Sequence, residues 1–153
     1  MTYITHVLGG VVVGGVAYTL FPVGGVLSFM GGAILGSLIP DLDHPNAFLN
    51  KRARARSVLT GFGHRTLTHS LLFAFLVLGI TLSMGVYKSV CIGLFWGILS
   101  HLMLDSMNPS GVPWLFPYNR KFSIARIRTG AGAEYGVFFI LAGMIYAYFQ
   151  FIA

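Results

Sequence analysis

Charged residues are scarce in this chain of 153 residues. Asp, Glu, Lys and Arg together make up 9% of the sequence, whereas hydrophobic residues make up 56%. An average soluble domain has about 25% charged residues, so the composition excludes an ordinary soluble domain and indicates an integral membrane protein. The length allows one membrane-embedded domain, 1–153, without a separate soluble module.

Cysteine is rarer still, because Cys91 is the single example. One cysteine excludes an internal disulfide and a metal site built from several thiolates. A basic stretch before the first apolar segment is also lacking, and no convincing cleavage site follows that segment. We therefore expect the first apolar segment to be retained rather than removed as a signal peptide.

Acidic residues are outnumbered by basic ones, four against ten, which gives a net charge of +6. Such a charge can indicate a nucleic-acid partner, but the basic residues lie almost entirely in two loops between apolar segments, 45–65 and 108–133. Loops rich in Lys and Arg mark the cytoplasmic side of membrane proteins. We therefore expect no nucleic-acid partner, and we expect both loops to face the cytoplasm.

Apolar runs at 5–21, 23–39, 67–86, 89–107 and 134–152 predict five helices. The expected fold is all-α, an integral membrane bundle of about five helices. Small residues recur four apart in several of these runs, as at Gly32 and Gly36 or Gly93 and Gly97. Such spacing lets membrane helices approach closely, and we expect the first two helices to form a hairpin.

The stretch around Pro40 carries unusual chemistry, because Asp41, Asp43 and His44 follow directly on an apolar run. Carboxylate oxygens and imidazole nitrogens beside a hydrophobic segment are the usual ligands of a divalent metal ion. His101 and Asp105 are four residues apart in the fourth helix, so they lie on one helical face.

Every histidine and every acidic residue falls at the cytoplasmic ends of the expected helices. Polar residues that merely collect where water is available would occur at both membrane faces, so the set favours a metal or catalytic site. Singly, Glu134 also suits an ordinary helix start, and His6 and His64 suit a chain end and a loop. The candidate metal ligands are His6, Asp41, Asp43, His44, His64, His69, His101, Asp105 and Glu134.

Charge counting predicts how many ions the site binds. The four carboxylates with neutral imidazoles carry a charge of about −4 next to apolar surroundings, which two divalent cations would balance. Nitrogen and oxygen donors without sulfur fit zinc, and also manganese or iron. Asp43 or Glu134 could act as a general base towards the activated water. Arg65 could hold a phosphate oxygen, although a role in setting the topology explains it as well.

Four ordered motifs resemble those of the YdjM-type family of inner-membrane proteins, which are described as metal-dependent hydrolases. That family is remotely similar to zinc-dependent phospholipases C and related nucleases. The resemblance implies a bacterial inner-membrane location, phosphodiester substrates, and metal ligands at His6, Asp41, His69, His101, Asp105 and Glu134. The motifs are Thr5-His6, Pro40-Asp41-Leu42-Asp43-His44, His64-Arg65-Thr66-Leu67-Thr68-His69-Ser70 and His101-Leu102-Met103-Leu104-Asp105.

The expected function is hydrolysis of a phosphoester in a lipid or lipid-linked substrate, by metal-activated water at the cytoplasmic face of the membrane. The expected partners are the lipid bilayer and a phosphate-containing lipid. Two other classes of protein could use the same ligands: a metal-ion or proton-coupled transporter, and a non-enzymatic scaffold with a structural metal. A transporter typically places its ligands near mid-membrane on broken helices, whereas these ligands are expected at one end.

Overall fold

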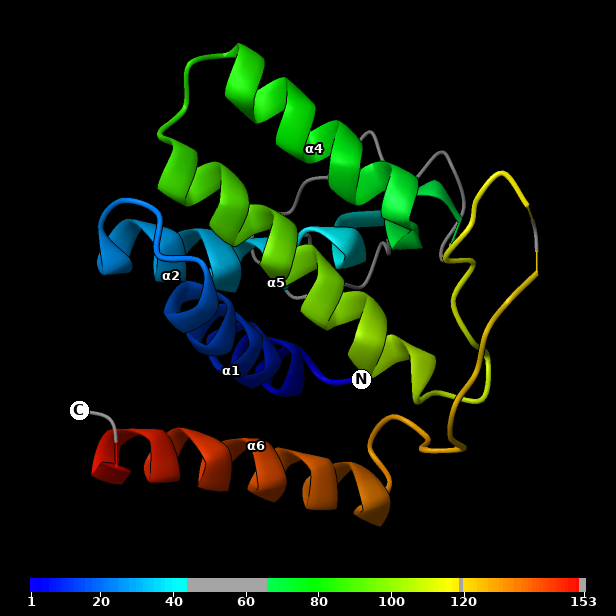
Figure 1. Cartoon of the computed structure of the whole chain (residues 1–153). Coiled ribbons are helices and arrows are strands. Elements are labelled where there is room, and N and C mark those ends of the chain that lie inside the picture. The colour runs from blue at the N-terminus through cyan, green and yellow to red at the C-terminus, as the bar shows by residue number, and fades with distance from the viewer. Residues whose placement is uncertain (44–65, 119, 152–153) are drawn as a thin grey trace, which may run out of the picture.

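The computed structural model describes residues 1–43, 66–118 and 120–151, and these residues form a helical bundle (Figure 1). The expected all-α fold with five helices is confirmed. An isolated antiparallel bridge joins Val112 and Phe122. The elements in chain order are α1 (Tyr3–Leu20), α2 (Val26–Gly36), the short 3-10 helix η1 (Pro40–Asp43), the short 3-10 helix η3 (Leu67–His69), α4 (Leu71–Ser83), α5 (Lys88–Ser106) and α6 (Gly132–Phe151).

Within the described residues, three apolar segments are long enough to cross a membrane: Tyr3–Leu20, Val26–Asp43 and Lys88–Ser106. The apolar helices Leu71–Ser83 and Gly132–Tyr148 are shorter. Large apolar side chains are exposed on the outside of the bundle, among them Leu27, Phe75 and Phe139. In water such a surface would be unfavourable, so these faces imply a surrounding lipid bilayer.

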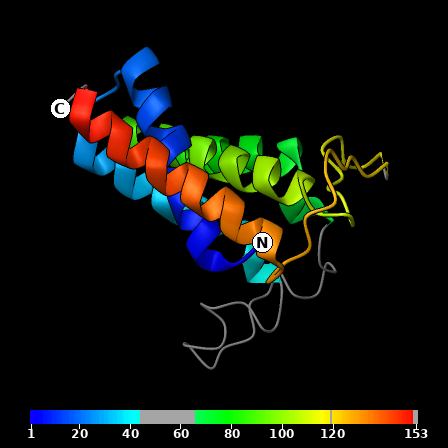
Figure 2. The same ribbon diagram turned by 90° about the horizontal axis from the view of Figure 1, so that it is seen from below.

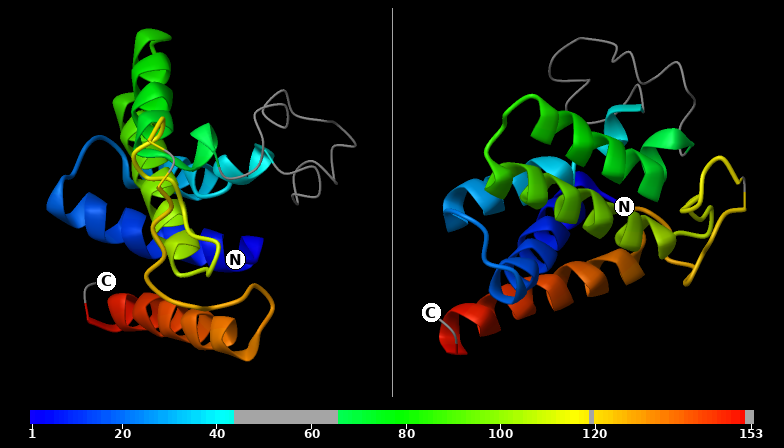
Figure 3. Two further views of the ribbon diagram at one scale, coloured as in Figure 1. Left: turned by 90° about the vertical axis from the view of Figure 1, so that its right-hand side faces the viewer. Right: turned by 45° about the horizontal axis from the view of Figure 1, so that its top comes forward.

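Helix α5 is the centre of the bundle and packs against α1, α2 and α4. Helices α4 and α6 lie on opposite sides of it (Figure 3). Helix α6 packs against α1, and its first turn lies beside the N-terminus of the chain (Figure 2). The start of α1, the end of α5 and the start of α6 therefore meet at one end of the bundle.

The backbones of α2 and α5 touch because glycines face each other across this interface. A Cβ atom at Gly97 would lie 2.1 Å from the carbonyl oxygen of Ala33, and one at Gly36 would lie 2.2 Å from that of Leu94. Small residues at such positions let membrane helices pack at backbone distance. The expected stripe of small residues in α2 thus contacts α5, while the hairpin with α1 packs through Gly14, whose Cβ would meet Ala33.

Two helices are shorter than the sequence indicated. Helix α2 ends at Gly36, before Pro40, and η1 then begins at that proline. A proline disfavours helical conformation in the residue that precedes it, which accounts for the break. Helix α4 begins at Leu71, because the Ser70 side chain accepts a hydrogen bond from the Phe73 amide at 3.2 Å. Ser70 is therefore the residue that caps the first turn of α4.

Substitution of Gly97 by alanine should lower the free energy of unfolding by about 2 kcal/mol or more, because the new Cβ would overlap the α2 backbone. The matched control is Gly136→Ala, since no heavy atom lies within 4 Å of a Cβ built there. Thermal unfolding in detergent measures both variants. Equal midpoints for Gly97→Ala and Gly136→Ala would contradict the backbone contact between α2 and α5.

Candidate metal centre

Two imidazole rings form the centre of the buried polar cluster. His101 projects from the last turns of α5 and His69 from η3, and both side chains are fully buried. Their Nε2 atoms lie 3.3 Å apart. The Nδ1 atom of His101 donates a hydrogen bond of 2.7 Å to the carbonyl oxygen of Ser37. A carbonyl only accepts, so Nδ1 carries the proton and the Nε2 lone pair of His101 faces His69.

His69 is held in the same way by a carboxylate. Its Nδ1 atom lies 3.3 Å from Asp43 Oδ2 and 3.1 Å from the hydroxyl of Thr68. Thr68 in turn donates its proton to Asp43 Oδ2. Both neighbours of Nδ1 therefore accept from it, and its proton stays on Nδ1. An acceptor behind each ring, with Nε2 facing inward, is the arrangement that orients metal-binding histidines.

Two further carboxylates approach the pair of Nε2 atoms. Asp105 Oδ2 lies 3.6 Å from Nε2 of His69 and 3.8 Å from Nε2 of His101. Asp41 Oδ1 lies 4.0 Å and 3.7 Å from the same two nitrogens. Asp105 is 1% exposed as a residue, whereas the Asp41 side chain is 26% exposed and is the part of the cluster open to solvent. Each of these two carboxylate oxygens therefore lies within 4.0 Å of both Nε2 atoms.

The other side of Asp105 faces His6. Asp105 Oδ1 lies 3.5 Å from His6 Nε2 and accepts a hydrogen bond of 2.8 Å from the amino group of Met1. The His6 ring stacks on that of His101, with centroids 3.8 Å apart. His6 is fully buried, and neither ring nitrogen has a hydrogen-bond partner among the described residues. A buried imidazole without partners is unfavourable unless a cation or a water contacts it.

The distances fit a divalent metal ion. Two nitrogens bound about 2.05 Å from a tetrahedral zinc ion lie about 3.3 Å apart, which is the separation of the two Nε2 atoms. Donor atoms of His69, His101 and Asp105 lie within 4.8 Å of one another, and so do those of His6, Asp41 and His101. The two groups share His101, whose Nδ1 is already bonded to Ser37, so its Nε2 can serve a single ion.

The same geometry affects protonation of His69. Burial lowers the pKa of the His69 imidazole, but hydrogen bonds to Asp105 and Asp43 outweigh burial and raise the pKa above its ordinary value. The negative charge around Nε2 therefore favours a cation there, whether a proton or a metal ion. Binding of a metal requires loss of that proton.

Glu134 lies beside this cluster in the first turn of α6 and is 4% exposed. Its Oε1 accepts hydrogen bonds from the Thr2 amide and, at 3.1 Å, from the Thr5 hydroxyl. Its Oε2 accepts one of 2.6 Å from the Gly130 amide. The carboxylate thus binds amides at the starts of two helices, where negative charge is favourable. This arrangement supports a structural role for Glu134, and its predicted role as ligand or base stays a prediction.

The structure brings most of the sequence-predicted residues together. Asp43 contacts Nδ1 of His69, the ring nitrogen opposite the one that faces His101. This contact orients the His69 ring and does not direct the Asp43 carboxylate at the two Nε2 atoms. The carbonyl of Ser37 and the hydroxyl of Thr68 were not foreseen. A sequence does not indicate which backbone carbonyl will accept a hydrogen bond, whereas Thr68 could have been found as the neighbour of His69.

Five predicted ligands converge: His6, Asp41, His69, His101 and Asp105. His44, His64 and Arg65 lie outside the described residues.

Replacement of Glu134 by glutamine should reduce the free energy of unfolding by about 1–2 kcal/mol. The charged carboxylate accepts three hydrogen bonds, and a neutral amide in its place accepts them less well. Divalent-metal content should not change. Thr5→Val should show part of the loss and Thr5→Ser little of it, since serine keeps the hydroxyl. A fall in metal content in a folded Glu134→Gln protein would instead identify Glu134 as a ligand.

Comparison with known proteins places the chain among bacterial membrane proteins. The family model described as "YdjM inner membrane protein" matches residues 1–152. The chain is 35% identical to uncharacterized protein YvsG of Bacillus subtilis (strain 168) over 150 residues, which cover 96% of this chain and 91% of YvsG. It is 34% identical over 123 residues to inner membrane protein YdjM of Escherichia coli (strain K12), covering 75% of this chain and 62% of that protein. No solved structure matches. The chain therefore belongs to the YdjM inner membrane protein family.

Proposed function

We propose that this protein is a metal-dependent hydrolase that cleaves a phosphoester of a lipid or lipid-linked substrate at the cytoplasmic face of the inner membrane. The observation that carries the proposal is the pair of Nε2 atoms 3.3 Å apart, each on a ring whose other nitrogen is held by an acceptor. Structural histidines usually satisfy both nitrogens with protein hydrogen bonds. Here two inward lone pairs and two carboxylates converge, which favours a metal ion.

The candidate metal ligands lie on two sides of the Asp105 carboxylate. On its Oδ2 side, His69, His101 and Asp41 supply the other donors for a first ion. On its Oδ1 side, His6 faces the same carboxylate at 3.5 Å. Asp105 would therefore hold an ion on its Oδ2 side together with these residues, and His6 would be available as a donor on the other side. The Met1 amino group already lies 2.8 Å from Oδ1, so a second ion on that side would have to displace it. The expected count of two ions stays a prediction, and the nitrogen-rich donor set favours zinc over manganese or iron.

A divalent ion held here would act as a Lewis acid on a phosphoryl oxygen and lower the pKa of water. The protein's own groups do the rest. Asp43 and the Ser37 carbonyl keep the protons of His69 and His101 on Nδ1, so that both Nε2 atoms stay available. Asp41 is the exposed member of the cluster, so solvent can reach its carboxylate. Its carboxylate could accept a proton from the attacking water.

A transporter is the second candidate, and one observation favours it. The apolar segment Val26–Asp43 is long enough to span the membrane, yet its helix breaks between Gly36 and Pro40. Broken membrane helices that carry ligands are common in transporters. The cluster nevertheless lies at helix ends, which favours the hydrolase. Metal uptake into vesicles that contain the purified protein separates the two functions. A purely structural metal would give neither uptake nor turnover.

Replacement of Asp105 by asparagine should lower metal affinity by at least about 10–100-fold and abolish phosphoester hydrolysis. Asparagine keeps the side-chain volume of Asp105 but removes the negative charge that faces His69 and His101 on one side and His6 on the other. Elemental analysis and turnover on phosphodiester and phosphomonoester lipids provide the measurements, and we expect close to two ions per wild-type chain. Glu134→Gln serves as the comparison, because it also removes a buried carboxylate charge; metal and turnover retained there would show that loss of a buried charge alone does not explain the Asp105→Asn result.

Two results would contradict the proposal. Wild-type protein that stays metal-free in excess Zn²⁺ and Mn²⁺ would rule out the metal centre. Metal-loaded wild-type protein that hydrolyses none of the lipids, but moves metal across a vesicle membrane, would make the transporter the better reading. If Asp105→Asn keeps both metal and turnover, then Asp105 is an ordinary helix-end carboxylate.

The cytoplasmic location of the site has a separate test. A single cysteine at Ser123, in a Cys91→Ser background, should be shielded from a membrane-impermeant thiol reagent in intact cells. A single cysteine at Tyr87, which is 82% exposed at the opposite end of the bundle, should be labelled. The reason is that basic residues cluster on the cytoplasmic side and only Lys88 lies near Tyr87. Labelling at Ser123 in sealed cells would place the site outside.

A further inference from the structure

The loop between α5 and α6 exposes apolar side chains that a loop in water would bury. Leu115 is 54% exposed, Tyr118 56%, Phe122 44% and Ile124 79%. The helices of this bundle expose apolar groups because lipid covers them, but this loop belongs to no helix. Exposed apolar and aromatic side chains beside the ends of membrane helices are typical of segments that lie in the lipid headgroup layer.

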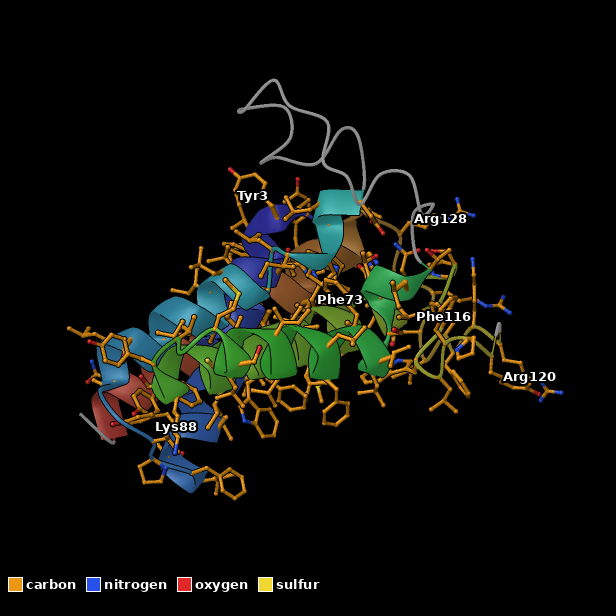
Figure 4. The ribbon with its side chains drawn as sticks, turned by 90° about the horizontal axis from the view of Figure 1, so that it is seen from above. Tyr3, Phe73, Lys88, Phe116, Arg120 and Arg128 are labelled. Atoms are coloured by element: carbon orange, nitrogen blue, oxygen red, sulfur yellow. The ribbon has the colours of Figure 1, made fainter. Side chains whose placement is uncertain are left out.

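Positive charge is interleaved with these apolar groups. Arg120, Lys121, Arg126 and Arg128 are all exposed. Among the described residues no carboxylate pairs with any of them, and the loop itself contains no acidic residue. The guanidinium of Arg120 instead lies 5.9 Å from the centre of the Tyr118 ring. Figure 4 shows Arg120 and Arg128 at one end of the bundle and Lys88 at the other.

The loop is fixed to the helix that carries the site. The amide of Ile124 donates a hydrogen bond of 2.7 Å to the carbonyl of Ser106, the last residue of α5. The indole Nε1 of Trp114 donates to the Ser106 hydroxyl at 2.7 Å. The bridge between Val112 and Phe122 closes the loop on itself. The basic and apolar groups therefore keep a defined position next to the site end of α5.

We infer that this loop, residues 112–118 and 120–128, binds the headgroups of anionic phospholipids. Apolar side chains would enter the interface while the four basic side chains contact phosphates, which is the recognition that polybasic interfacial segments use. A nucleic acid would match the charge but not the exposed Leu115 and Ile124. A soluble protein would match the apolar groups, yet the loop lies at the ends of membrane helices. The inference does not depend on the metal centre.

The test uses the full chain in vesicles of equal parts phosphatidylglycerol and phosphatidylcholine. A fluorescent label on Ile124→Cys, in a Cys91→Ser background, reports which lipid is near by quenching when one lipid or the other is brominated. We expect brominated phosphatidylglycerol to quench at least about twofold more than brominated phosphatidylcholine at low salt. The ratio should fall towards one when Arg120, Lys121, Arg126 and Arg128 are all replaced by glutamine, and also in high salt.

Two controls accompany this experiment. A label on Leu27→Cys, 86% exposed at the opposite end, should show a ratio near one. Lys88→Gln should leave the ratio at Ile124 unchanged. If the variant with all four glutamine replacements does not fold, the salt series on the labelled protein that keeps its four basic residues still tests whether the lipid preference is electrostatic. A label quenched by neither lipid would place the loop in water and favour a soluble partner. Equal quenching by both lipids, or a preference that survives loss of the four charges, would also overturn the inference.

Discussion

The close approach of the α2 and α5 backbones determines where the site can form. A Cβ atom at Gly97 would lie 2.8 Å from the amide nitrogen of Ser37, so no larger residue fits there. His101 lies one turn beyond Gly97, and at this separation its Nδ1 reaches the Ser37 carbonyl. That hydrogen bond fixes the proton on Nδ1 and frees Nε2. A packing constraint between two apolar helices therefore decides the chemical state of a buried imidazole.

Burial then makes a nearby positive charge favourable for the cluster. Asp105 and His101 lie in the most buried helix of the bundle, and His6 is fully buried without a hydrogen-bond partner among the described residues. Burying carboxylates in apolar surroundings is strongly unfavourable unless positive charge is close. The amino group of Met1 supplies one such contact to Asp105 Oδ1, and the Oδ2 side faces two imidazoles instead. The latter side is where a metal ion would lower the energy most.

The sequence predicted the helices from their apolar runs. It predicted the convergence of the ligands because the expected topology placed every histidine and acidic residue at the same end of the helices. His101 and Asp105 share a face at four-residue spacing, and apolar length identifies the spans. The sequence could not separate the roles of Asp41 and Asp43. In the short helix η1 they diverge, so Asp41 faces the two Nε2 atoms while Asp43 contacts His69 from behind. Nor could it show that Glu134 accepts a hydrogen bond from the Thr2 amide at the start of α1, since that contact depends on the fold.

Ser106 connects the candidate metal centre to the basic loop between α5 and α6. Its hydroxyl donates to the carbonyl of Leu102 at 2.7 Å and accepts from Trp114, while its own carbonyl accepts from Ile124. One turn of α5 therefore holds the His101–Asp105 pair on its inner side and the basic loop at its end. A lipid headgroup bound by that loop would lie in the same layer as the exposed edge of the site at Asp41. If the substrate is a lipid, it would then reach the site from the membrane surface rather than from bulk water.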